Sequence, residues 1–202
     1  MTIRIALAFM ACGAMASAQT ITFDDLGPSY AGTQIPNGYA GFDWNNFYDL
    51  TGAPYTGTGY STGVVSPGNV AFNDFGNPAS FSSGTEFNLT SAYVTSAFLG
   101  SENVEVEGFN GATKIYDTTY TVTDTGPTLL DFNYNDITSV TFVPSGGGGS
   151  GEQLVFDNVT IDGAAAPGGN PIVSSAVVDG GTTSLLLGGG LLGLGFLGKK
   201  LV

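Results

Sequence analysis

Several residue types are scarce in this chain of 202 residues, and each shortage removes a class of chemistry. There is no histidine, which removes the commonest proton shuttle and the imidazole metal ligand. The single cysteine leaves no disulfide within the chain and no cysteine-built zinc or iron–sulfur site. Four Lys and Arg stand against 17 Asp and Glu, a net charge of −13, so we expect no binding of nucleic acid through its phosphates.

What is present is sufficient for a folded core. Hydrophobic residues make up 42% of the chain and aromatic residues 12%, although only 10% are charged. All 17 acidic residues lie between Gln19 and Gly181, where Lys114 is the one basic residue, so this stretch carries a net charge of about −16 (17 negative, one positive). The length and this charge distribution predict one domain with an appendage at each end.

The first appendage has the pattern of a secretory signal peptide. A basic residue precedes the apolar run Ile5–Met15, which ends in Ala16-Ser17-Ala18. The run is too short to span a bilayer, which takes about 20 residues. We therefore predict a signal peptide over residues 1–18, with cleavage between Ala18 and Gln19. The alternatives are a buried N-terminal helix and lipoprotein processing at Cys12.

The second appendage follows a stretch of linker composition, residues 164–176. Gly180–Gly198 is an uncharged run of 19 residues, close to the ~20 that a membrane-spanning helix needs. Lys199 and Lys200 would hold its end on the cytoplasmic side and leave the body outside the membrane. The alternatives are a buried, glycine-rich pair of strands and a GPI signal, although such signals normally end on the apolar tail.

The start of this segment, residues 177–181, reads Val-Val-Asp-Gly-Gly and resembles the Val-Pro-Asp-Ser-Gly motif of VPDSG-CTERM tails, a variant of the bacterial PEP-CTERM-type sorting tails. The match is at Val177, Asp179 and Gly181, whereas Val178 replaces proline and Gly180 replaces serine. The resemblance covers residues 177–202. It implies an exported protein that is anchored in the membrane, processed by an exosortase-like protease/transpeptidase and associated with exopolysaccharide.

The body, residues 19–163, has the pattern of an all-β domain. Short runs of β-branched and aromatic residues alternate with Gly, Pro, Asn, Asp and Ser, and no long segment repeats at helical spacing. This predicts an antiparallel two-sheet sandwich of jelly-roll type. The predicted strands are Thr20–Phe23, Gly41–Phe47, Asn69–Asn73, Glu86–Leu89, Ala92–Phe98, Asn103–Phe109, Thr113–Val122, Thr128–Phe132, Ser139–Val143 and Gln153–Ile161.

Two local patterns refine this prediction. In the run Val104-Glu105-Val106-Glu107 the valines share one face and the glutamates the other, which is typical of a half-exposed strand. The glycine-rich stretch Ser145–Gly151 predicts a flexible connection. We expect it to join the strands before and after it as a loose hairpin.

The body also resembles secreted β-sandwich domains of the carbohydrate-binding, galactose-binding-like kind. The resemblance rests on the opening Phe-Asp-Asp of residues 23–25 and on the closing Phe-Asp-Asn-Val of residues 156–159. It covers most of residues 20–162, and it implies a non-catalytic domain that binds carbohydrate.

Asp157 is the most informative acid, because strict alternation with Val159 and Ile161 would turn it inward. A buried carboxylate needs hydrogen bonds or a cation. Asp24 and Asp25 end the first strand, which we expect beside the last. We therefore predict a structural Ca²⁺ held by Asp24 or Asp25, Asp157 and backbone carbonyls. The alternatives are a β-bulge that turns Asp157 outward and a carboxylate that caps backbone N–H groups.

Aromatic side chains supply the candidate ligand site. Trp44 lies among Asp43, Asn45 and other rings, a composition that suits either a sugar platform or a core strand. Tyr55 and Tyr60 stand in a Gly/Thr-rich loop, where exposed rings would favour ligand contact. No carboxylate pair stands out for glycoside hydrolysis. The sequence therefore predicts an exported, non-enzymatic protein of the cell surface or extracellular matrix. A carbohydrate-binding module with a defined glycan and a glycoside hydrolase or lyase are the alternatives.

Overall fold

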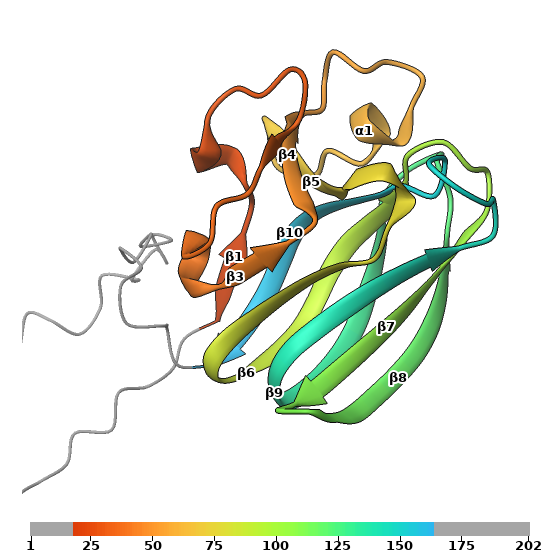
Figure 1. Ribbon diagram of the computed structural model, residues 1–202. Helices are drawn as coiled ribbons and strands as arrows, with labels where there is room; N and C mark the ends of the chain where they lie inside the picture. Colours follow the sequence, from red (N-terminus) through yellow and green to blue (C-terminus); the bar gives the residue numbers. More distant parts are fainter. Residues whose placement is uncertain (1–17, 164–202) are drawn as a thin grey trace, which may run out of the picture. The chain divides into compact units, whose positions relative to one another are not determined.

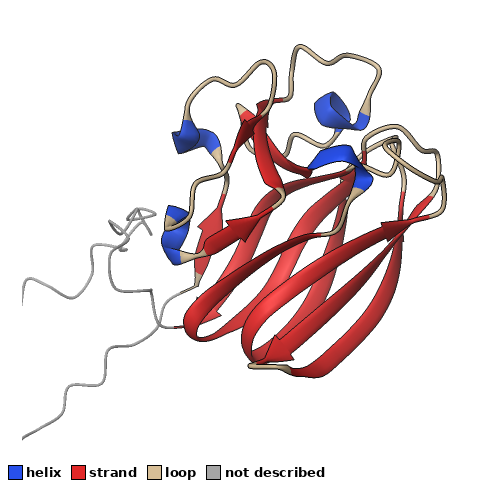
Figure 2. Cartoon of the chain, in the orientation of Figure 1, coloured by secondary structure: helices blue, strands red, loops and turns tan. Residues whose placement is uncertain are grey.

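The computed structural model describes residues 18–163, which form a nearly all-β domain (Figures 1 and 2). Four short helices lie in the connections: η1 (Asp24–Leu26), η2 (Tyr39–Gly41), α1 (Gly59–Thr62) and η3 (Asp74–Gly76). The strands are β1 (Gln19–Ile21), β2 (Thr33–Gln34), β3 (Asp43–Asn45), β4 (Phe47–Thr51), β5 (Asn69–Asn73), β6 (Ala79–Ser96), β7 (Glu102–Asn110), β8 (Thr113–Val122), β9 (Thr128–Ser145) and β10 (Leu154–Gly163).

All ten strands belong to one hydrogen-bonded antiparallel sheet. Its order is β2-β4-β5-β10-β6-β9-β7-β8, with β1 paired to β10 and β3 paired to β6. The expectation of two separate sheets is therefore wrong, whereas the antiparallel all-β class is confirmed. The first and last strands lie side by side as expected, with Ile21 opposite Val159.

The sheet becomes a sandwich because its two longest strands bend. The first part of β6, Ser80–Ser82, pairs with β3, whereas its second part, from Phe87 onward, pairs with β10. The register between β6 and β9 shifts between Ser82 and Phe87, at the bend. Figure 1 shows β6 and β9 curving from one layer of the domain into the other at this point. The two layers thus share continuous strands.

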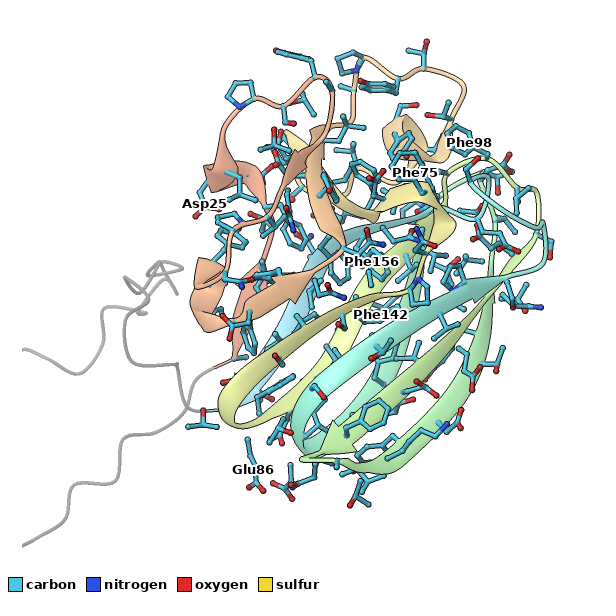
Figure 3. The ribbon with its side chains drawn as sticks, in the orientation of Figure 1. Asp25, Phe75, Glu86, Phe98, Phe142 and Phe156 are labelled. Atoms are coloured by element: carbon cyan, nitrogen blue, oxygen red, sulfur yellow. The ribbon has the colours of Figure 1, made fainter. Side chains whose placement is uncertain are left out.

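The main core lies between these layers. Phe142 of β9 and Phe156 of β10 meet there edge to face, with ring centroids 4.8 Å apart (Figure 3). Val104 and Val106 are fully buried in the same core, while Glu105 and Glu107 are half-buried on the opposite face. This confirms the alternation predicted for β7.

A second apolar cluster covers the outer face of β4, β5 and β10. It lies under the long connection between β4 and β5, which includes α1. Both faces of β5 are covered. Ala71 packs in the main core, whereas Val70 and Phe72 pack in the second cluster. The members of the second cluster are Leu50, Tyr60, Val70, Phe72, Ala97 and Val155.

Some sequence predictions match the observed elements and others do not. The bounds of β5 and β8 are as predicted, whereas β6 and β9 were each predicted as two shorter strands. The predicted hairpin through Ser145–Gly151 is wrong, because β6 lies between β9 and β10 in the sheet.

Within the described residues, we found no helix long and apolar enough to cross a membrane. The predicted signal cleavage site borders the described region, since β1 begins at Gln19. The predicted C-terminal helix and the motif residues Val177, Asp179 and Gly181 lie outside it.

Candidate functional site

Asp157, the acid that the sequence singled out, is fully buried, and its carboxylate caps a loop. One carboxylate oxygen accepts the backbone N–H groups of Val65 (2.7 Å) and Ser66 (2.9 Å). The other accepts the Ser66 hydroxyl at 2.9 Å and the Asn158 N–H at 2.7 Å. Burial raises the pKa of Asp157, while these hydrogen bonds act in the opposite direction. In the structure Asp157 therefore caps backbone N–H groups, which was one of the alternatives to calcium binding.

A β-bulge explains why Asp157 does not point into the main core. Its neighbour Asn158 has φ of 50°, and the register between β10 and β6 shifts after Asp157. Phe156, Val159 and Ile161 enter the main core, whereas Asp157 shares the outer face with Val155. The strict alternation assumed from the sequence is therefore interrupted by one extra residue.

The other two predicted calcium ligands have protein partners of their own. Asp24 accepts the backbone N–H of Asn69 at 2.9 Å, and Asp25 accepts the hydroxyl of Tyr39 at 2.6 Å. Among the residues that the structure describes, Asp24, Asp25 and Asp157 do not form a group with carboxylate oxygens within 4.8 Å of one another. The predicted set of ligands is thus not brought together.

A different set of oxygens converges near the start of the domain. The backbone oxygens of Phe23 and Gly27 and a carboxylate oxygen of Asp49 lie 3.5, 2.5 and 3.4 Å from Asn69 Nδ2. Asp49 and Asn69 are both 3% exposed, and burial raises the pKa of Asp49. The Asn69 amide donates to these three oxygens, while its Oδ1 accepts the Thr51 hydroxyl at 2.9 Å. These are the oxygen types that Ca²⁺ binds, and Asp24 lies beside them through the Asn69 backbone.

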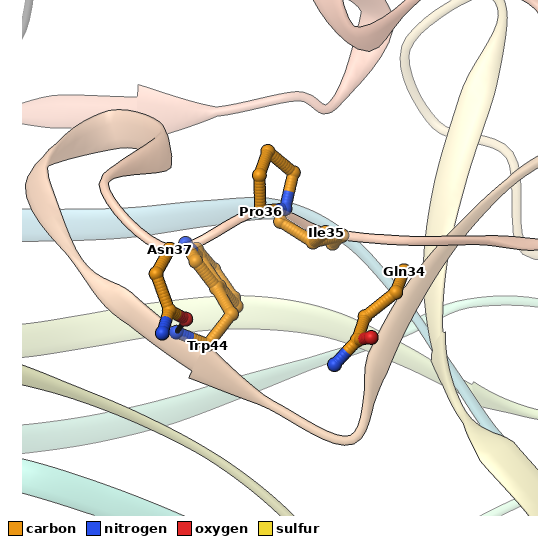
Figure 4. A pocket seen from close by; sticks show the side chains of 5 residues that line it. All are labelled: Gln34, Ile35, Pro36, Asn37 and Trp44. Atoms are coloured by element: carbon orange, nitrogen blue, oxygen red, sulfur yellow. Dashed lines mark hydrogen bonds between the residues drawn. The ribbon is translucent and has the colours of Figure 1, made fainter.

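Trp44 is a core residue and not an exposed platform, which corrects its proposed role as a sugar-stacking ring. It is 4% exposed, its indole N–H donates to the Tyr39 carbonyl at 2.9 Å, and its ring packs edge to face on Phe47. One edge of the indole still reaches a shallow depression of about 410 Å³ (Figure 4). The depression is lined by Gln34, Ile35, Pro36, Asn37 and Trp44, and none of these carries a charge.

Tyr55 and Tyr60 cover the second apolar cluster. Tyr60 is 6% exposed and its hydroxyl donates to the side-chain oxygen of Gln153, while half-buried Tyr55 donates to the Tyr30 carbonyl. Their rings lie 5.7 Å apart. The structure therefore brings these two predicted residues together, but it buries most of Tyr60.

One group of three carboxylates does occur, on the face of β7 and β8 turned away from the core. Oxygens of Glu105, Glu107 and Asp117 lie within 4.8 Å of one another. Lys114 bridges Glu107 at 2.8 Å and Asp117 at 2.6 Å. These bridges lower the pKa of Asp117, and its hydrogen bond with Glu105 raises the pKa of Glu105. The lysine ammonium thus occupies the place of a counter-ion in this cluster.

Glu102 is a buried acid that was not predicted from the sequence. It is 1% exposed; one carboxylate oxygen accepts the Ser96 hydroxyl, and the other has no hydrogen-bond partner. Burial raises the pKa of Glu102 to about 7, and the nearby charge of Glu152 acts in the same direction. The signal was available, because Glu102 shares the inward face of β7 with Val104 and Val106.

Comparisons with known proteins give no functional assignment. The sequence matches no protein-family model and no curated protein. Solved structures that resemble the fold include a cyclase from Fischerella sp. TAU, with TM-score 0.46 and 12% identity over 74% of this chain and 99% of that one. The K2 cleaved adhesin domain of Lys-gingipain has TM-score 0.43 and 11% identity over 73% and 100%. TmCBM61, solved with β-1,4-galactotriose, has TM-score 0.32 and 10% identity over 66% and 98%. At these values we transfer no ligand or activity.

Proposed function

We propose that the chain is an exported, non-enzymatic β-sandwich protein of the cell surface or extracellular matrix, anchored by its C-terminal segment until an exosortase-like enzyme processes it. The observation that carries the proposal is the position of the fold within the chain. Within residues 18–163, which the structure describes, the ten strands run from Gln19 to Gly163. Cleavage after Ala18 and removal of the segment from residue 177 onward would leave each of these strands intact.

Cell fractionation tests this proposal. The exported protein should begin at Gln19, which intact mass or N-terminal sequencing would establish. Deletion of Gly181–Val202 should move the body from the membrane fraction to the soluble fraction, because the deleted part holds all but the first residue of the uncharged run Gly180–Gly198. Retention of residues 1–18 in the exported protein, or sedimentation of the truncated protein with membranes, would refute the proposal.

A structural calcium ion is part of the same proposal, but its ligands differ from those expected from the sequence. The oxygens of Phe23, Gly27 and Asp49, which converge on Asn69 Nδ2, support this position better than Asp24, Asp25 and Asp157, whose carboxylates are not brought together. The ion would neutralise Asp49, a carboxylate that is almost completely buried, and would tie the turn after β1 to β4 and β5.

Carbohydrate binding is the second candidate function. It is favoured by aromatic rings that remain exposed in the loops around α1, although Trp44 is not one of them. A glycoside hydrolase or lyase is favoured less. In the carboxylate cluster of Glu105, Glu107 and Asp117, Lys114 already pairs with two of the three.

A further inference from the structure

Two exposed phenyl rings stand at the end of the domain that carries α1. Phe75 is 66% exposed and Phe98 is 49% exposed, whereas nine other phenylalanines of the described region are fully or almost fully buried. Figure 3 labels both rings near α1, with Glu86 at the opposite end of the domain. Large apolar side chains that stay in water contribute little to folding, and several that gather in one patch mark a candidate binding surface.

The chain segment Glu152–Gln153 lies between these two rings. On one side, the N–H of Ala97, the residue before Phe98, donates to the Gln153 carbonyl at 2.7 Å. On the other side, Gly76, the residue after Phe75, is so close to this segment that an added Cβ would lie 3.2 Å from the Glu152 carbonyl. The residues next to Phe75 and Phe98 therefore both contact this short segment, and Figure 3 labels the two rings at the same end of the domain.

Phe98 is held by a buried ring beneath it. Tyr60 packs edge to face on Phe98 with centroids 5.6 Å apart, and on its other side Tyr60 packs on Phe72 at 5.4 Å. The Tyr60 hydroxyl donates to Gln153. The exposed ring thus rests on the second apolar cluster and is already positioned before any ligand binds, which lowers the entropy cost of binding.

The backbone conformation of Phe75 lowers the stability of the domain. Its backbone has φ of 55° and ψ of 21°, a left-handed conformation that costs a bulky residue about 1–2 kcal/mol. Glycine or asparagine would adopt it with less strain, and neither would expose an apolar ring. Its N–H donates to the Asp74 carboxylate at 3.1 Å, which fixes the turn and the direction of the ring. Neither the strained backbone of Phe75 nor the exposure of its ring adds to the stability of the domain.

The chemistry around the rings favours a sugar polymer without negative charge. Flat rings match the apolar faces of pyranoses, and the flanking Asp74, Glu152 and Gln153 offer groups that bind hydroxyls. Within residues 18–163 the one basic side chain is Lys114, which is paired with Glu107 and Asp117. The net charge of about −16 between Gln19 and Gly181 repels polyanions and also a second copy of this chain.

We infer that Phe75 and Phe98, with Gln153 between them, form a binding platform for a neutral polysaccharide. This inference rests on the proposed extracellular function and names the site by which the body engages the polysaccharide. It moves the site away from the depression beside Trp44.

Affinity electrophoresis in native gels tests the platform with the full chain in a nonionic detergent. The gels contain laminarin, a neutral galactan or a neutral mannan, and alginate serves as the polyanion. We expect at least one neutral polysaccharide to retard the protein, and alginate not to do so. Phe75→Asn and Phe98→Ser should each weaken that retardation about tenfold in dissociation constant. Ile115→Thr, which removes a 44% exposed aliphatic side chain on β8, should leave it unchanged.

A melting curve for each variant separates binding from folding. Phe75→Asn should melt at or above the wild-type temperature, because asparagine tolerates the left-handed backbone better. Retardation by none of the neutral polysaccharides, equal retardation of the double variant, or retardation by alginate alone would overturn the inference. None of these results would alter the cell fractionation, so failure of the platform and failure of the proposed export are distinguishable.

Discussion

Asp157 and Ser66, 91 positions apart in the sequence, are joined by two hydrogen bonds of 2.9 Å, one from the backbone N–H of Ser66 and one from its hydroxyl. The pair ties the middle of β10 to the loop that covers the outer face of β5. The Val65 N–H adds a third bond from the same loop. The Asp157 carboxylate therefore organises this loop.

We predict that Asp157→Asn lowers the free energy of unfolding by about 2–3 kcal/mol, because an amide nitrogen would face N–H donors that now bind a carboxylate oxygen. Urea unfolding followed by tyrosine and tryptophan fluorescence measures this change. Asp131→Asn, at an exposed position on β9, is the matched control and should change the unfolding midpoint little. An unchanged midpoint for Asp157→Asn would contradict the capping role.

The raised pKa of Glu102 predicts how the free energy of unfolding depends on pH. Its pKa is about 7 in the folded protein, above its ordinary value, so the folded state keeps a proton that the unfolded chain releases. The contribution of Glu102 to the free energy of unfolding is therefore greatest below the pKa that Glu102 has in the unfolded chain. This contribution falls as the pH rises to about 7, by about 3 kcal/mol in total. Glu102→Gln should flatten this part of the profile and raise stability at pH 8.

The measurement is the urea midpoint between pH 4 and pH 9. Glu86→Gln is the control, because Glu86 is exposed at the opposite end of the domain, as Figure 3 shows. If the wild type and Glu102→Gln showed parallel pH profiles, Glu102 would not be the titrating group.

Gly59 is predicted to tolerate no side chain. An added Cβ would lie 1.8 Å from the Ser96 carbonyl oxygen, and the Gly59 N–H donates to the Ala97 carbonyl at 2.7 Å. Gly59→Ala should therefore push α1 off the sheet and destabilise the domain by about 2–3 kcal/mol. Gly84→Ala, where an added Cβ meets no atom within 4 Å, is the control. Equal thermal midpoints for the two variants would refute this close approach.

Calcium dependence is predicted to follow Asp49 and not Asp157. A chelator should lower the melting temperature, and millimolar Ca²⁺ should restore it by ~5 °C through binding to the folded state. Asp49→Asn should remove that response, whereas Asp25→Asn should keep it, because exposed Asp25 is engaged by Tyr39. Mg²⁺ at equal ionic strength controls for general screening. An equal response to both ions, or a response that survives Asp49→Asn, would exclude this site.

The sequence predicted the parts of the fold that depend on local pattern. Alternation in β7 gave the correct inward face, and β-branched composition gave the bounds of β5 and β8. The bend in β6 was not predictable, because Ser83-Gly84 has the local character of a turn, while pairing with β9 on both sides of the bend keeps the strand continuous. Tertiary contacts there override local preference.

The candidate site was less predictable, because its partners are distant in the sequence. Asp157 was correctly singled out, but the loop that satisfies it lies 91 positions away. Nothing in the sequence around Trp44 distinguishes a platform from a core ring; the rings packed around it place it in the core. Phe75 and Phe98 could not be selected either, since their shared surface arises only where β10 begins between them.

The pairing of β1 with β10 has a consequence for the order of folding. Thr20 faces Thr160, so the first strand to emerge during synthesis must wait for the last, 140 residues later, before it finds its partner. Such long-range closure makes completion of the sheet slow compared with the formation of the local β7–β8 hairpin. The sheet therefore cannot be completed until the final strand of the described domain has been synthesised.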